Sequence, residues 1–188
     1  MRPPGQKRTM PRISVHEEPS GARNVFRHYL RDIVYGANDG IITTFAVVAG
    51  VTGGALSART IIVVGVANLF ADGLSMGVGN YLSIRSHESA REALDLPEEE
   101  ASPARHGAMT FAAFALAGVV PLMPYLVGEG SFALCVVLTL AALFAVGAAR
   151  SLVTVDRWAG AGLEMLVLGI VVAGAAYGSG ALAAWVLG

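Results

Sequence analysis

Five long stretches of this 188-residue chain hold at most one charged residue each. A helix that crosses a bilayer needs about 20 mostly apolar residues, because hydrocarbon offers the backbone no water partner. The stretches that meet this requirement are residues 33–53, 60–84, 107–127, 131–149 and 158–187. We therefore expect an all-α membrane protein with five transmembrane helices and the lipid bilayer as a partner.

The charged residues cluster outside these spans. The chain has 13 Lys and Arg residues and 14 Asp and Glu residues, for a net charge of −1, so we expect no nucleic-acid partner. Most of the charges lie in two segments, residues 1–31 and 85–105. The expected organisation is a polar cytoplasmic N-terminal segment at 1–31 and a transmembrane domain at 32–188, which includes a short cytoplasmic acidic segment at 85–105.

Basic residues near the span ends predict the orientation, because Lys and Arg favour the cytoplasmic side. With alternating spans, only Arg59 falls on one side of the membrane. The basic residues on the other side are Arg2, Lys7, Arg8, Arg12, Arg23, Arg27, Arg31, Arg85, Arg91, Arg105, Arg150 and Arg157. The N-terminus is thus expected in the cytoplasm and the C-terminus outside.

Three acidic residues lie inside the spans, where a charge is costly and points to function. At about 1.5 Å per helical residue, Asp39 is roughly 12 Å, Asp72 roughly 20 Å and Glu164 roughly 10 Å from the nearest cytoplasmic arginine. All three are therefore expected in the cytoplasmic half of the membrane.

The second span carries a stripe of possible metal ligands. Asn68, Asp72, Met76 and Asn80 recur every four residues, which places them along one helix face. Carboxylate and amide oxygens suit hard divalent ions, and a thioether adds a preference for softer ones, so the set suits a borderline transition metal such as Fe²⁺. The alternative is a packing role, with hydrogen bonds between helices and Met76 filling a gap.

The acidic segment offers a further metal-binding hypothesis. Glu88, Glu92 and Asp95 stand three and four residues apart, on one face of a helix that continues the second span. A solvated, salt-bridged face is the alternative. In the third span, Pro121 and Pro124 are expected to kink or end the helix near its outer end.

Four sequence runs resemble the vacuolar iron transporter family. They are DGIITTFAVVAG at 39–50, ANLFADGLSMGVGNYLS at 67–83, PLMPY at 121–125 and GLEMLVLG at 162–169. The resemblance implies a five-span homodimer whose path lies between the protomers, with Asp39 and Met76 facing it. It also implies export of Fe²⁺, and of Mn²⁺ in some members, from the cytosol in exchange for protons.

The chain departs from the family pattern in two places. Eukaryotic members have a glutamate where this chain has Asn68, and Asp72, one turn along, would substitute for it. They also have a larger glutamate-rich cytosolic domain after the second span. The chain is similar to a short, prokaryotic member in which that metal-binding domain is reduced to about twenty residues.

We therefore expect a Fe²⁺ transporter, with Mn²⁺ as a second substrate. The protein is not expected to be an enzyme or to have a resident cofactor. Its expected partners are divalent ions, protons and a second copy of itself. A passive divalent-cation channel and a non-transporting scaffold are the alternatives. The expected location is the plasma (inner) membrane. The residues expected to contact metal are Asp39, Met76, Asp72, Asn68, Glu88, Glu92 and Glu164.

Overall fold

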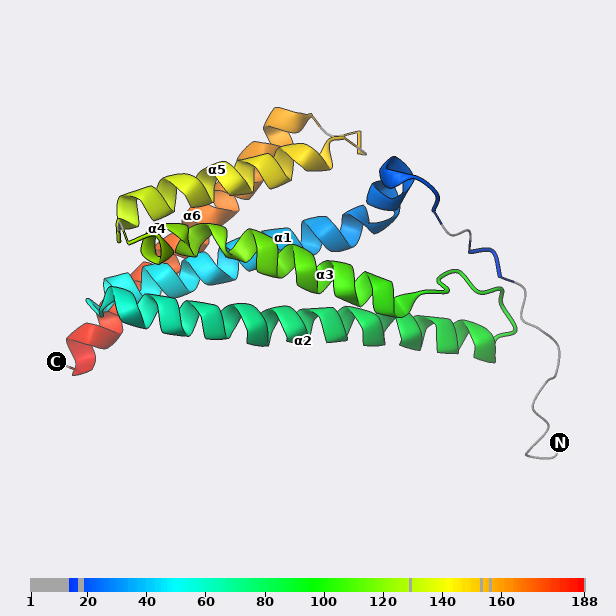
Figure 1. The fold of residues 1–188 in the computed structure, drawn as a ribbon, viewed down its shortest axis with the longest axis horizontal. Coiled ribbons are helices and arrows are strands. Elements are labelled where there is room, and N and C mark those ends of the chain that lie inside the picture. The colour runs from blue at the N-terminus through cyan, green and yellow to red at the C-terminus, as the bar shows by residue number, and fades with distance from the viewer. Residues whose placement is uncertain (1–13, 17–18, 129, 153, 156, 188) are drawn as a thin grey trace.

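The computed structural model describes residues 14–16, 19–128, 130–152, 154–155 and 157–187. Four of the basic residues that predict the orientation lie outside these ranges: Arg2, Lys7, Arg8 and Arg12. The helices are α1 (Ala22–Gly53), α2 (Ala58–Ala93), α3 (Pro103–Gly118), the 3₁₀ turn η1 (Val120–Leu122), α4 (Met123–Leu126), α5 (Phe132–Arg150) and α6 (Trp158–Leu187). Figure 1 shows them side by side in one elongated bundle.

Five helical segments of the described chain are long and apolar enough to cross a membrane, as the charge-free stretches predict. The first two are longer than the predicted spans. α1 begins at Ala22, within the polar N-terminal segment, and α2 runs on to Ala93, into the acidic segment. α1 begins at one end of the bundle and α6 finishes at the other, as an odd number of crossings requires (Figure 1).

The third span is interrupted where its prolines predict. α3 ends at Gly118, and the chain passes through a 3₁₀ turn that contains Pro121 before α4 completes the segment. A proline in a helix interior removes a backbone donor and clashes with the preceding turn, which accounts for the break. Both Pro121 and Pro124 are fully buried here.

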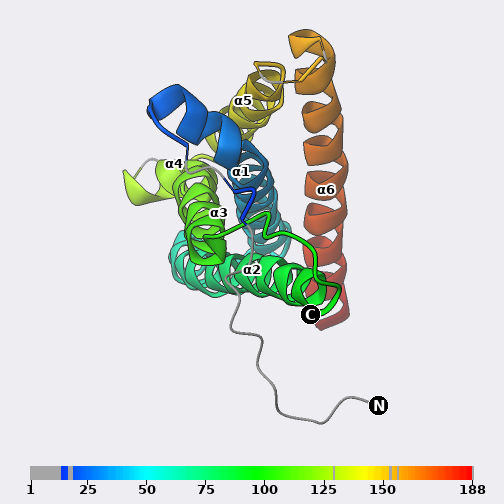
Figure 2. The same cartoon turned by 90° about the vertical axis from the view of Figure 1, so that its right-hand side faces the viewer.

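α1 is the central helix of the bundle, and it contacts α2, α3, α5 and α6 (Figure 2). Small residues allow its closest approach. A Cβ added at Gly36 or Gly40 would collide with the backbone carbonyls of Thr110 and Phe114 on α3. Phe114 is fully buried in the core between α1, α2 and the third span.

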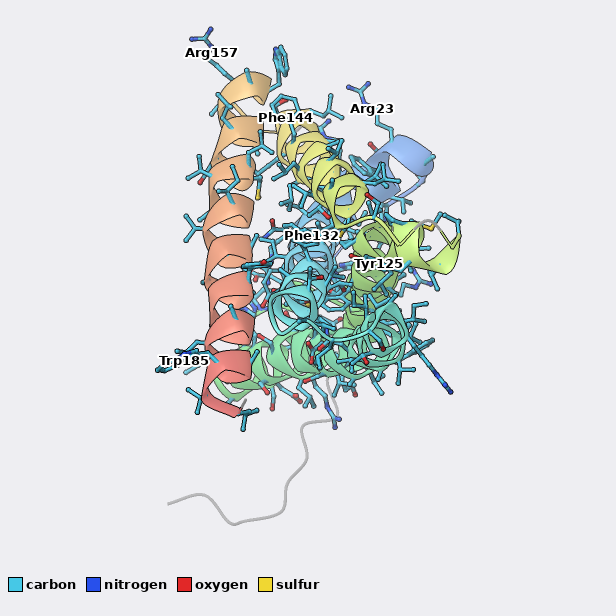
Figure 3. All side chains as sticks on the ribbon, turned by 90° about the vertical axis from the view of Figure 1, so that its left-hand side faces the viewer. Arg23, Tyr125, Phe132, Phe144, Arg157 and Trp185 are labelled. Carbon is cyan, nitrogen blue, oxygen red and sulfur yellow. The ribbon has the colours of Figure 1, made fainter. Side chains whose placement is uncertain are left out.

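The outward faces of α2 and α6 are apolar and exposed in the single chain. Arg157 and Trp185 lie at opposite ends of α6, which runs along the edge of the bundle (Figure 3). A Cβ added at Gly174 or Gly178 of α6 would meet no atom of the described residues within 4 Å. This surface is suited to lipid or to a second apolar surface rather than to water.

Candidate functional site

The polar stripe on α2 follows the helix as its four-residue spacing predicts. Asn68, Met76 and Asn80 are half-buried, whereas Asp72 is exposed in the single chain. The Asn68 amide nitrogen is buried without a hydrogen-bond partner among the described residues. Such a buried donor is uncommon and needs an explanation, such as a bound ion, a water or a partner surface.

Asp39 on α1 comes close to this stripe. Its side chain is half-buried, and the carboxylate interacts electrostatically with that of Asp72. Two carboxylates from different helices thus lie within electrostatic range of each other. Like charges at such a place repel unless a cation or a proton lies between them.

We call the end of the bundle where α1 begins and the α2–α3 loop lies its N-terminal end. A buried polar network lies one to two turns nearer this end than Asp39 does. Its centre is Asp32, which is only 3% exposed. Asp32 Oδ1 accepts a hydrogen bond from Asn80 Nδ2 at 2.7 Å, and Oδ2 lies 2.6 Å from His106 Nδ1. Asn80 Nδ2 also lies 2.8 Å from Thr110 Oγ1. The network joins α1, α2 and α3.

Two pockets meet at Asp32. One, of about 350 Å³, lies under the α2–α3 loop and is lined by histidines and glutamates, including His106 and Glu100. The other, of about 440 Å³, is lined by Met76 and Asn80. Both also contain Arg31, Asp32 and Ser83 in their walls. The lining is therefore continuous from the α2–α3 loop to Met76, one turn from Asp72.

The acidic residues near the end of α2 have different environments. Glu88 is buried, and its Oε1 accepts the backbone N–H groups of Glu99 at 3.2 Å and Glu100 at 3.1 Å. Glu92 is exposed. Ligand atoms of His87, Glu88 and Glu99 all lie within 4.8 Å of one another. Glu88 thus holds the α2–α3 loop in place and also belongs to a possible metal-binding group.

Glu164 has a separate environment. Its Oε2 lies 2.7 Å from Arg150 Nη2, in an ion pair between α6 and the end of α5. The Glu164 side chain is 57% exposed. Glu164 does not line either of the two pockets that meet at Asp32.

Sequence reasoning missed Asp32, His106, Glu99 and Glu100 as site residues. Asp32 directly follows Arg31, so it reads as a charge that flanks the first span. The histidines lie outside the spans and show no metal-binding spacing. Only the folded chain brings these positions together, because the network joins residues up to 74 positions apart.

Comparison with known proteins agrees with the sequence runs. The model of the VIT family matches residues 30–95 and 87–181, which together cover most of the chain. Vacuolar iron transporter 1 of Eucalyptus grandis is 26% identical, over 93% of this chain and 93% of that protein. Its Arabidopsis thaliana counterpart is 26% identical, over 79% of this chain and 83% of that protein.

A shorter match has higher identity. A vacuolar iron transporter of Toxoplasma gondii is 42% identical over 76 residues, which are 40% of this chain and 25% of that protein. The family match spans all five membrane-crossing segments, with the Asp39, Met76 and Glu164 positions inside it. The chain is therefore a multi-pass membrane protein that belongs to the VIT family.

Proposed function

We propose that this protein exports divalent transition-metal ions, Fe²⁺ and also Mn²⁺, from the cytosol in exchange for protons. The observation that carries the proposal is the continuous polar lining from the α2–α3 loop past Asp32 to Met76. Asp72 lies one turn from Met76 on α2, and Asp39 on α1 is close enough to Asp72 for their charges to interact. Ionisable and polar side chains are costly inside a membrane and often mark the path of an ion, which supports the proposal.

The ligand chemistry favours a borderline divalent ion. Asp39 and Asp72 supply carboxylate oxygens, Asn68 an amide oxygen and Met76 a thioether sulfur. Oxygen ligands suit Mn²⁺, and the sulfur favours Fe²⁺ over harder ions. In this scheme the metal is the transported substrate, the protein has no resident cofactor, and it is not an enzyme. Relatives named vacuolar iron transporters support this assignment.

A homodimer would complete the path. Asp72 is exposed in the single chain, on the flank of α2 opposite the exposed apolar side chains of Phe70, Leu74 and Val78. A carboxylate that faced lipid there would be costly, so its helix face needs a cover. A second copy of the chain provides one and places two Asp39 and two Met76 side chains along one path.

Proton exchange follows from the carboxylates. Asp72 can hold either a metal ion or a proton, so protonation from the outside would release the ion. Glu88 and Glu92 would attract ions at the cytoplasmic mouth, with Asn68 as a later ligand. Glu164, the remaining acid of the spans, would hold the end of α5 against α6 through its ion pair with Arg150, and it would contact metal only if the ion left the path described above.

The proposed orientation places the N-terminal end of the bundle in the cytosol and the C-terminus outside. Arg23, Arg27 and Arg31 at the start of α1 support it, because basic residues favour the cytoplasmic side. The proposed location is the plasma membrane of a prokaryotic cell.

Transport is tested in liposomes that contain the purified protein and a fluorescent metal indicator. We expect Fe²⁺ and Mn²⁺ to enter, and we expect Asp39→Ala and Met76→Leu each to lower the rate at least tenfold. Met165→Leu is the matched control, because it makes the same change at a buried methionine of α6 that packs in the core with Ile41 and Leu143. Absence of flux with a correctly folded protein would exclude transport and favour the scaffold alternative.

The same liposomes distinguish an exchanger from a passive channel. We expect a more acidic interior to accelerate metal uptake at constant membrane potential. We also expect metal entry to be accompanied by proton exit from the liposomes. A metal flux whose rate does not depend on the proton gradient would favour the channel alternative.

A further inference from the structure

Three imidazoles converge on one carboxylate oxygen at the N-terminal end of the bundle. Glu100 Oε2 lies 3.1 Å from His106 Nε2, 3.5 Å from His16 Nδ1 and 3.6 Å from His28 Nε2. These four residues, which we call the histidine cluster, come from the segment before α1, from α1, from the α2–α3 loop and from α3. Four separate parts of the chain thus meet at one point.

The separations fit a metal ion. With bonds of about 2.1 Å, a tetrahedral ion holds its ligand atoms about 3.4 Å apart. The three distances from Glu100 Oε2 lie on both sides of this value. Ligand atoms of His16, His28 and Glu100 also all lie within 4.8 Å of one another. His106 lies outside this group of three and contacts it through Glu100 Oε2, so its ring would have to move toward His16 and His28 to complete a four-ligand site.

The surrounding residues hold two of the imidazoles in a binding orientation. The buried His106 turns its Nδ1 to Asp32 Oδ2 at 2.6 Å, so its Nε2 points to Glu100. A carboxylate behind a ligating histidine is the usual support in metal sites, because it fixes the ring and raises its basicity. Tyr29, which is 5% exposed, packs against both His28 and His106, with ring centroids 4.7 Å apart in each case.

A hydrogen-bonded cluster without metal would leave one polar atom unexplained. His28 Nε2 is buried and makes no hydrogen bond to any residue that the structure describes. Glu100 Oε2, at 3.6 Å, lies just beyond hydrogen-bond distance. A buried ring nitrogen of this kind is costly without a partner, and a metal ion between it and Glu100 would provide one.

We propose that the histidine cluster binds one divalent transition-metal ion through His16, His28, His106 and Glu100. Three imidazoles and one carboxylate suit Zn²⁺, Fe²⁺ or Co²⁺ better than Mg²⁺ or Ca²⁺. The ion would fasten the segment before α1 over the pocket under the α2–α3 loop. That segment already contacts the loop through Val15 N–H, which donates to Glu98 O at 2.9 Å. The cluster's role as a first station for transported ions rests on the proposed function; its metal binding does not.

Cobalt titration of the purified full chain tests the site, because Co²⁺ bound by nitrogen ligands absorbs visible light. We expect one Co²⁺ per chain with such absorption. His28→Asn and Glu100→Gln should each weaken this binding at least tenfold, and Asp32→Asn roughly tenfold through its support of His106. Glu98→Gln is the matched control for Glu100→Gln, since it removes the same charge from the same acidic run. Metal-free melting temperatures near that of the native protein would show that the variants fold.

Two further variants separate this site from others. Asp39→Ala removes the proposed path ligand, and we expect it to leave the Co²⁺ absorption unchanged. Retention of the signal in His28→Asn and Glu100→Gln would overturn the proposal, as would its loss in His87→Asn, which alters the other possible metal-binding group.

Absence of Co²⁺ absorption together with normal Fe²⁺ flux would overturn the site and leave transport intact. Co²⁺ binding without any flux would refute transport and leave the site intact.

Discussion

Asp32 lies at the centre of the polar network that joins α1, α2 and α3, so removal of its carboxylate should destabilise the bundle. The carboxylate is 3% exposed, receives a hydrogen bond from Asn80 at 2.7 Å and lies 2.6 Å from His106 Nδ1. Asp32→Ala deletes both contacts and leaves two buried polar groups with less support. A hydrogen bond to a charged group contributes about 1.5–3 kcal/mol, and breaking a buried charged pair costs about 3–5 kcal/mol.

We therefore expect Asp32→Ala to lower the free energy of unfolding by about 3–5 kcal/mol. At about 2–4 °C per kcal/mol for a chain of this size, the melting temperature should fall by roughly 6–20 °C. Asp32→Asn keeps the shape and one acceptor for Asn80, so its loss should be smaller. Thermal unfolding of the purified protein in one detergent measures all three proteins.

The matched control is Glu92→Gln, which removes a carboxylate from an exposed position on α2. Surface changes of this kind stay within about 0.5 kcal/mol. If Asp32→Ala melted within 2 °C of the native protein (roughly 0.5–1 kcal/mol), the network would not stabilise the helix crossing.

Three further predictions concern glycine packing, the Glu164 ion pair and the proposed metal ligand Asp39. Gly40→Ala should destabilise the bundle strongly and Gly178→Ala hardly at all, because the added methyl group collides with α3 in the first case and meets no atom within 4 Å in the second; equal melting temperatures would contradict this. Glu164→Gln should lower the melting temperature, because it breaks the pair with Arg150 and leaves that arginine with less support inside the spans, and an unchanged melting temperature would contradict this. Asp39→Asn should slow Fe²⁺ flux without changing the melting temperature by more than a few degrees, and native flux would argue against its role as a ligand.

The spans could be predicted from sequence because the bilayer imposes one requirement on every crossing segment. Length and lack of charge therefore locate both ends of the last three spans to within about four residues, and Pro121 and Pro124 locate the break in the third span. The same rule cannot find where a helix extends beyond the apolar stretch. α1 begins at Ala22 and α2 ends at Ala93. Both extensions lie in charged segments, where the chain can form either a helix or a loop in water.

The site was only partly predictable for a different reason. Four-residue spacing places Asn68, Asp72 and Met76 on one side of α2 whatever the tertiary structure. The partners of Asp32 depend on how three helices cross, which no local pattern records. Identical glycine spacing on α1 and α6 shows the same limit, since a Cβ at Gly40 would collide with α3 and a Cβ at Gly178 would meet no described atom within 4 Å.

Metal export in exchange for protons requires that the two fluxes be coupled, and liposomes allow both to be measured at once. Liposomes that contain the protein would be given Fe²⁺ outside and a more acidic interior, and metal entry and internal pH would be followed together at a clamped membrane potential. We predict Fe²⁺ entry coupled to a rise in internal pH, with both signals lost in Asp39→Ala. Fe²⁺ entry without any pH change, or no entry at all, would contradict the claim.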